Sequence, residues 1–140
     1  MKKLVAYFIV SMFLVGPIWA DVVTGVFKTN PSEETGGYLH IEFGACPEDK
    51  NLSCGTIKAA IRKDGSSNGD YEHLEKLMVW NMKYGGDGKY KSGKIWDPSE
   101  NNDDGSKKIY NSKMEIKGDI LRVDGCILFF CKSQDWQRVN

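Results

Sequence analysis

The chain has 140 residues, with 19 basic and 19 acidic side chains, 41% hydrophobic residues and four cysteines. The length suits one domain with a hydrophobic core of its own. The balanced charge favours neither nucleic acid nor an anionic membrane surface as a partner.

The first 20 residues have the composition of a secretory signal peptide. Two lysines precede an apolar run over residues 4–15, and the small residue Ala20 stands before Asp21. We therefore expect cleavage after Ala20, export to the periplasm or the medium, and a single mature domain over residues 21–140. The apolar run is short for a membrane span and no second such run follows, so no integral membrane segment is expected after cleavage.

Short runs rich in β-branched and aromatic residues alternate with glycine and aspartate clusters along the rest of the chain. This spacing predicts an all-β protein, an antiparallel barrel or sandwich of eight strands. Residues 70–78 could form a short helical turn, and we expect residues 98–106 to form a long polar loop. The predicted strands are residues 22–28, 37–43, 53–62, 77–83, 89–96, 107–117, 120–126 and 131–139.

Four cysteines downstream of the signal peptide indicate two disulfides in an exported chain. The short spacings favour the pairs Cys46 with Cys54 and Cys126 with Cys131. A zinc site is the alternative, but no C-x2-C spacing occurs, so no metal is expected.

A four-residue loop over residues 85–88 would set Trp80 opposite Gly93. The indole would then cover a residue that has no side chain, which is a known way to fill a sheet. A shift of one residue would reverse this arrangement.

The turn at Gly118 and Asp119 predicts the register of the strands on either side of it. A two-residue turn sets Met114 against Val123 on an apolar face and places opposite charges together on the other face. Direct opposition of Cys126 and Cys131 carries the same alternation into the last strand. The side chains predicted to point inward include Tyr110, Met114, Leu121, Val123, Gln134, Trp136 and Arg138.

Seven side chains could line a cavity for a small, partly apolar molecule: Trp80, Tyr110, Met114, Leu121, Val123, Trp136 and Arg138. Arg138 could pair there with an anionic group of the ligand. The alternative is an ordinary core, which is the more common role of such residues.

Four apolar residues, 127–130, lie between the last two cysteines, where a polar turn is usual. The alternation turns Ile127 and Phe130 inward and leaves Leu128 and Phe129 at the tip. We expect this pair to fold over the barrel mouth as a lid or a cap, because burial of each side chain stabilises by about 1.5–3 kcal/mol. The alternative is an exposed contact surface.

Several motifs occur in a specific order: "SGKIWDP", "KIYNSKMEI", "GDILRVDGC" and "CKSQDWQRV". Together they resemble an exported bacterial family designated a domain of unknown function, whose members have a lipocalin-like β-barrel. The matching positions are Gly93, Ile95, Trp96, Asp97, Pro98, Tyr110, Gln134, Trp136, Arg138 and Val139. The resemblance implies an eight-stranded up-and-down lipocalin-like barrel and supplies no activity. In barrels of this kind an arginine near the last strand packs on an aromatic ring of the first strand and closes one end, so the resemblance implies that Arg138 packs on Phe27. The segments "SENNDDGSK" and "GSSNGDYEHLEK" depart from the family pattern, so no ligand can be transferred.

The first functional hypothesis is an exported lipocalin-like protein that binds a small apolar ligand inside the barrel. The second is an envelope or host-facing interaction module with a solid barrel, for which the partner is a protein or a second copy. An enzyme is not expected, because His40 and His73 lie in no nucleophile or metal motif. We expect no catalytic residue and no cofactor.

Overall fold

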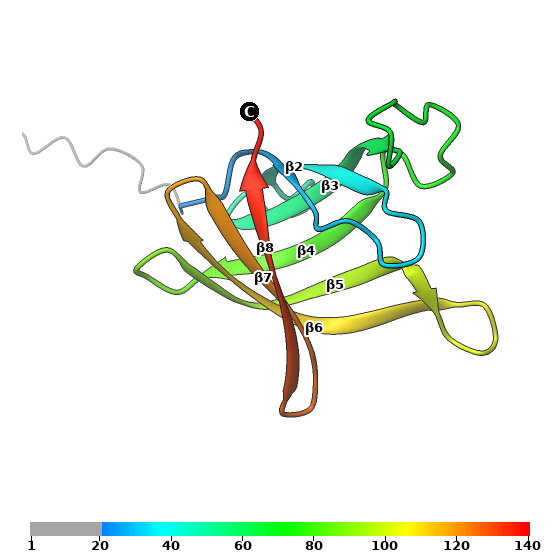
Figure 1. Cartoon of the computed structure of the whole chain (residues 1–140). Coiled ribbons are helices and arrows are strands. Elements are labelled where there is room, and N and C mark those ends of the chain that lie inside the picture. Colours follow the sequence, from blue (N-terminus) through cyan, green and yellow to red (C-terminus); the bar gives the residue numbers. More distant parts are fainter. Residues whose placement is uncertain (1–20) are drawn as a thin grey trace, which may run out of the picture.

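The computed structural model describes residues 21–140, so the predicted signal peptide lies outside the described residues. Eight antiparallel strands, each paired with the next along the chain, close into a barrel through pairing of β8 with β1 (Figure 1). The strands are β1 Gly25–Lys28, β2 Tyr38–Ala45, β3 Leu52–Ile61, β4 Leu77–Tyr84, β5 Lys89–Asn101, β6 Lys107–Lys117, β7 Ile120–Ile127 and β8 Phe130–Arg138. The predicted all-β, up-and-down barrel is thus confirmed. Residues 70–78 form turns followed by the start of β4, and no helix occurs within residues 21–140.

The register around the turn at Gly118 is the predicted one. Met114 pairs with Val123 across β6 and β7, and Leu121 pairs with Trp136 across β7 and β8. Gly118 adopts a φ of 57°, a left-handed conformation that glycine accepts without strain and that such tight turns require. The turn residues and the alternation of apolar side chains therefore predict the register of β6, β7 and β8 correctly.

The predicted register of β4 and β5 is wrong by one residue. Trp80 pairs with Lys94 rather than facing Gly93, because residues 85–89 separate the paired Tyr84 and Tyr90. Gly93 is covered by Met82 instead: a Cβ on Gly93 would lie 2.4 Å from the Met82 Sδ atom. The close packing over glycine is present, with a thioether in place of the indole.

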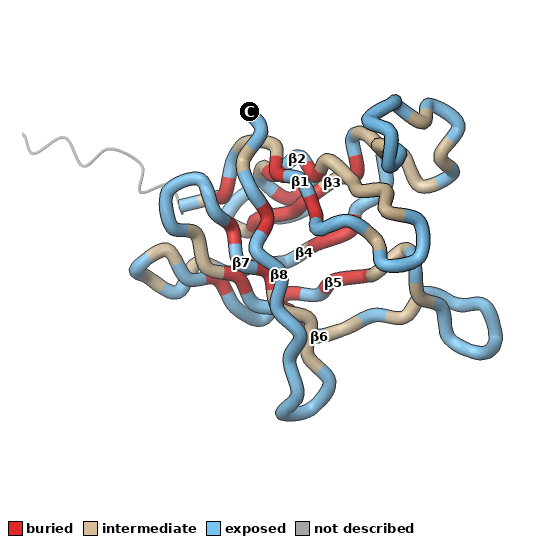
Figure 2. Tube along the Cα trace, in the orientation of Figure 1, coloured by how far each residue is buried: buried red, intermediate tan, exposed pale blue. Residues whose placement is uncertain are grey.

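Side chains of the barrel strands fill its interior. The largest fully buried ones are Trp96, Trp136 and Phe27. Aromatic contacts connect the first strand to the last, because Phe43 packs edge-on against Phe27 at 5.8 Å and lies 6.3 Å from Trp136 between ring centroids. Figure 2 shows the buried segments gathered in the body of the barrel, while the hairpin ends beyond it are exposed. Within residues 21–140, no helix has the length and apolar character that a bilayer crossing requires.

Candidate functional site

The candidate ligand-binding residues separate into a packed group and an edge group. Met114, Leu121, Val123 and Trp136 are buried in one continuous core, whereas Trp80 and Tyr110 are partly buried at its margin. Two hollows on the surface of the described chain, of about 380 and 370 Å³, lie outside this core. The interior is therefore occupied by side chains, and a role of these residues in ligand binding stays a prediction.

At the margin of the barrel, the Tyr110 hydroxyl forms a hydrogen bond between two strands. Its hydroxyl donates a hydrogen bond to the Glu100 carboxylate. Burial and this hydrogen bond raise the pKa of the Tyr110 phenol, so the group stays protonated as a donor. Tyr110 thus ties β6 to the end of β5.

Arg138 closes the opposite end of the barrel as predicted. Its guanidinium carbon lies 4.6 Å from the centroid of the Phe27 ring, and Nη1 donates to the Thr24 carbonyl oxygen at 2.7 Å. A Cβ on Gly25 would lie 2.1 Å from the same Nη1, so glycine makes room for the guanidinium. This side chain has a structural role that needs no ligand anion.

Gln134 is exposed, which corrects its predicted place inside the barrel. Its parity is the predicted one, but β8 at this point runs beyond the closed part of the barrel. The Gln134 side-chain amide oxygen, Oε1, accepts a hydrogen bond of 2.7 Å from Trp136 Nε1. It therefore satisfies the polar atom of a buried indole.

Both predicted disulfides are present. Cys46 and Cys54 have Cα atoms 4.9 Å apart, and Cys126 and Cys131 have Cα atoms 4.1 Å apart. The second pair occupies directly opposed positions of β7 and β8. It clamps these strands where they leave the barrel body, a place that we call the neck of the hairpin.

The tip of this hairpin, residues 127–130, projects into solvent (Figure 1). The exposed fractions are 52% for Ile127, 85% for Leu128, 98% for Phe129 and 83% for Phe130. The prediction that Leu128 and Phe129 fold over the barrel mouth is therefore wrong, as is the inward orientation of Ile127 and Phe130. The strands stay paired up to Ile127 and Phe130, so the two residues left for the turn cannot bring the tip back to the barrel.

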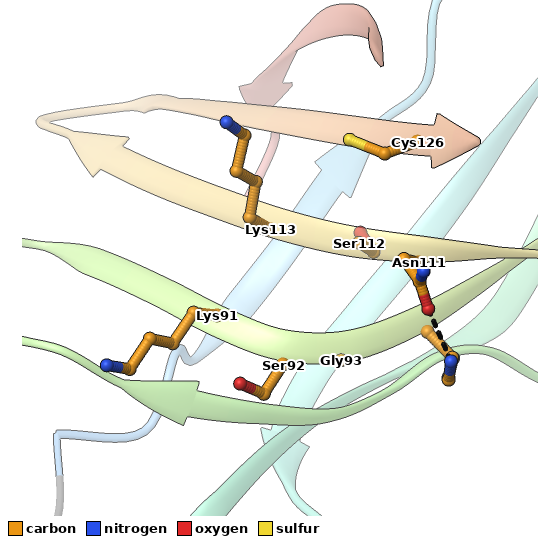
Figure 3. A pocket seen from close by; sticks show the side chains of 8 residues that line it. Lys91, Ser92, Gly93, Asn111, Ser112, Lys113 and Cys126 are labelled. Carbon is orange, nitrogen blue, oxygen red and sulfur yellow. Dashed lines mark hydrogen bonds between the residues drawn. The ribbon is translucent and has the colours of Figure 1, made fainter. Parts of the chain in front are cut away.

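A basic hollow lies on the outer face of the sheet beside the neck. Lys91 and Lys94 of β5 and Lys113 of β6 line it, and Cys126 forms its border (Figure 3). Lys94 Nζ donates to the Asn111 side-chain oxygen, and Lys113 lies 3.8 Å from the Asp124 carboxylate. The whole-chain charge gives no sign of this cluster; only the strand register brings these lysines together.

The part of the chain that the structure describes contains no group of three or more His, Cys, Asp or Glu side chains arranged to hold a metal ion. The described residues form a closed eight-stranded antiparallel barrel with an exposed apolar hairpin tip. Residues 25–138 match the family described as "Uncharacterized protein conserved in bacteria (DUF2147)", and the chain belongs to that family. No curated protein and no solved structure matches the chain.

Proposed function

We propose that this protein is an exported, non-enzymatic interaction module in which the barrel is a rigid support and the β7–β8 hairpin is the contact element. The observation that carries the proposal is the exposure of four consecutive apolar side chains, Ile127 to Phe130, at the end of that hairpin. Soluble proteins rarely expose contiguous apolar surface without a binding role.

Export is supported by two features of the chain. Both cysteine pairs are bonded, which suits an oxidising compartment, and free cysteines are absent from the described residues. The N-terminal 20 residues have signal-peptide composition. The protein is thus proposed to act in the periplasm or outside the cell.

A disulfide and a tight turn restrain the hairpin, which suits a contact element. The Cys126–Cys131 bond fixes the neck, and the turn above it contains Leu128 at a φ of 53°. Leucine is unfavourable in this left-handed region, where glycine is the usual choice. A strained, apolar turn costs stability, and such local costs are typical of functional sites. A pre-ordered tip also loses less conformational entropy when it binds.

The hypothesis of a small apolar ligand inside a lipocalin-like barrel is the second candidate. Two of the residues that would line such a cavity, Leu121 and Trp136, are fully buried among core side chains. A ligand would therefore have to displace them. Titration with a hydrophobic fluorescent probe separates the two functions. Saturable quenching of tryptophan that Trp136→Phe weakens and a tip variant leaves unchanged would favour the internal ligand.

The test of the proposed function uses the double variant Leu128→Ser/Phe129→Ser of the whole chain, expressed in a bacterial host. The matched control is Leu77→Ser/Ile120→Ser, which removes two exposed apolar side chains away from the tip. We expect the parent and the control to remain with the envelope after gentle release of exported proteins, and the tip variant to be released. Equal distribution of all three would contradict the contact role. An unprocessed parent with reduced cysteines would contradict export.

A further inference from the structure

We propose that the partner of the tip is the interface of an anionic phospholipid bilayer, into which residues 127–130 insert. This inference rests on the proposed function and names its partner. It is carried by the chemistry of the tip, by its distance from the neck and by the lysines around the neck.

The tip has the chemistry that a hydrocarbon environment requires. Its four side chains carry no polar group, and Ile127 and Phe130 form the last pair of the ladder. Backbone polar groups that enter a bilayer must be hydrogen-bonded within the protein. A paired two-residue hairpin with a clamped neck leaves few of them free.

The length of the tip fits insertion to an interfacial depth. The turn begins two residues beyond Cys126, a rise of about 7 Å at the strand spacing of about 3.3 Å per residue. Elements that lie in a membrane interface are buried to roughly 5–10 Å. If the four apolar residues are immersed, the disulfide lies at the level of the lipid headgroups.

At the level of the disulfide, lysines lie on both faces of the sheet, Lys132 on the hairpin itself and Lys94 on β5. Lys94 pairs with Asn111, which pairs with Cys126, so Lys94 shares the row of the disulfide on its outer face. Lys132 follows Cys131 and, by strand alternation, projects from the opposite face. Both can reach lipid phosphates when the tip is inserted.

Uncompensated positive charge continues behind this row. Lys91 lines the same hollow as Lys94, and within residues 21–140 neither of them, nor Lys132, has a carboxylate within ion-pair distance. Lys113 is partly neutralised by Asp124. The balanced charge of the whole chain argued against an anionic surface, but the local charge at the neck is positive and complements one.

A second copy of this chain fits the tip less well. Two hollows on the described surface have charged side chains in their lining, Lys91 and Lys94 in one and Asp49 and Lys83 in the other. Insertion of Leu128 and Phe129 into either hollow would place apolar side chains against these charged groups. A bilayer accepts a convex apolar tip without a complementary hollow.

The test is flotation of the purified, fully oxidised protein with protein-free vesicles. One set contains only phosphatidylcholine and the other equal parts of phosphatidylcholine and phosphatidylglycerol. We expect the parent to float with the anionic vesicles, and Leu128→Ser/Phe129→Ser to lower its partition coefficient about a hundredfold. Leu77→Ser/Ile120→Ser should bind like the parent.

The charge contribution is tested with Lys91→Gln/Lys94→Gln/Lys132→Gln. On anionic vesicles we expect the partition coefficient to fall roughly fivefold per lysine, and on neutral vesicles we expect no change. At high salt, the variant and the parent should bind anionic vesicles equally, because salt screens the charges. The matched control is Lys50→Gln/Lys63→Gln/Lys76→Gln, at exposed positions elsewhere. A Phe129→Trp variant should show blue-shifted emission on vesicles and quenching by shallow brominated lipids.

Failure of the parent to bind vesicles, or binding that the tip variant retains, overturns the bilayer as partner. If envelope retention still depends on the tip while the parent ignores vesicles, the partner is a protein and the proposed function stands. Tip-dependent self-association without vesicle binding likewise assigns the tip to a second copy.

Discussion

Cys126 and Cys131 face each other across β7 and β8 with Cα atoms 4.1 Å apart, two residues below a turn whose side chains lie in solvent. The disulfide holds the neck of the hairpin at the place where contacts with the barrel body end. From this position the disulfide can keep the hairpin tip ordered, although the tip has little packing of its own.

Replacement of both neck cysteines by alanine should loosen the hairpin more than the barrel. The closed loop is short, so the loss of unfolding free energy should be about 2 kcal/mol by loop entropy. Amides of residues 125–132 should exchange faster, while amides of β2 and β3 keep their protection. Hydrogen exchange with urea unfolding measures both effects, and uniform loss of protection across the barrel would contradict this role of the disulfide.

Gly93→Ala should destabilise the barrel through Met82. The added Cβ would lie 2.4 Å from the Met82 Sδ atom and 2.9 Å from the Trp80 carbonyl oxygen. Overpacking of this kind costs about 1–3 kcal/mol. In a double-mutant cycle with Met82→Ala, the double variant should lose less unfolding free energy than the two single variants together. The smaller side chain at position 82 removes one of the clashes. Strict additivity would show that Met82 does not cover Gly93.

Arg138→Lys should weaken the closed end although it preserves the charge. Lysine cannot stack a planar group on Phe27 while donating to the Thr24 carbonyl oxygen. We expect a loss of about 1–2 kcal/mol in urea unfolding. Lys132→Arg, which changes an exposed cation elsewhere on β8, is the control and should leave stability unchanged. Equal stability of Arg138→Lys and the parent would refute the proposed closure.

His40 should make the protein less stable in mild acid. Burial, with the nearby charge of Lys28, lowers the pKa of His40 below its ordinary value of 6.5. The folded state therefore favours the neutral imidazole, and the unfolded state binds more protons as the pH falls below 6.5. Unfolding free energy should thus decrease between about pH 7.5 and pH 5.5, and less so in His40→Gln. Identical pH profiles of variant and parent would exclude this contribution.

The register of β6, β7 and β8 could be predicted because independent signals agree there. Gly118 specifies a tight turn, Met114 and Val123 define one apolar face, and the cysteines require direct opposition. The β4–β5 register could not be predicted in the same way. Asn81 and Ser92 adopt positive φ within these strands, at 59° and 62°. Neither residue type is sufficient to predict such an irregularity from the sequence.

The alternation predicts which way a side chain faces, but not where a barrel ends. Gln134 and Phe130 have the parity of Trp136, yet both are exposed because the hairpin continues past the last neighbouring strand contacts. The length of that extension depends on the tilt and stagger of all the strands, which are properties of the closed barrel. For the same reason, the sequence alone does not predict that the tip and the lysines near its neck form one continuous surface.

The free energy of unfolding of Leu128→Ser/Phe129→Ser, measured in urea against the parent, tests most directly whether the tip is a contact element rather than part of the core. The exposed tip predicts a change within about 0.5 kcal/mol, as for other surface substitutions. A loss of about 3 kcal/mol or more, the sum expected for two buried side chains, would show that the pair caps the barrel and would contradict the account.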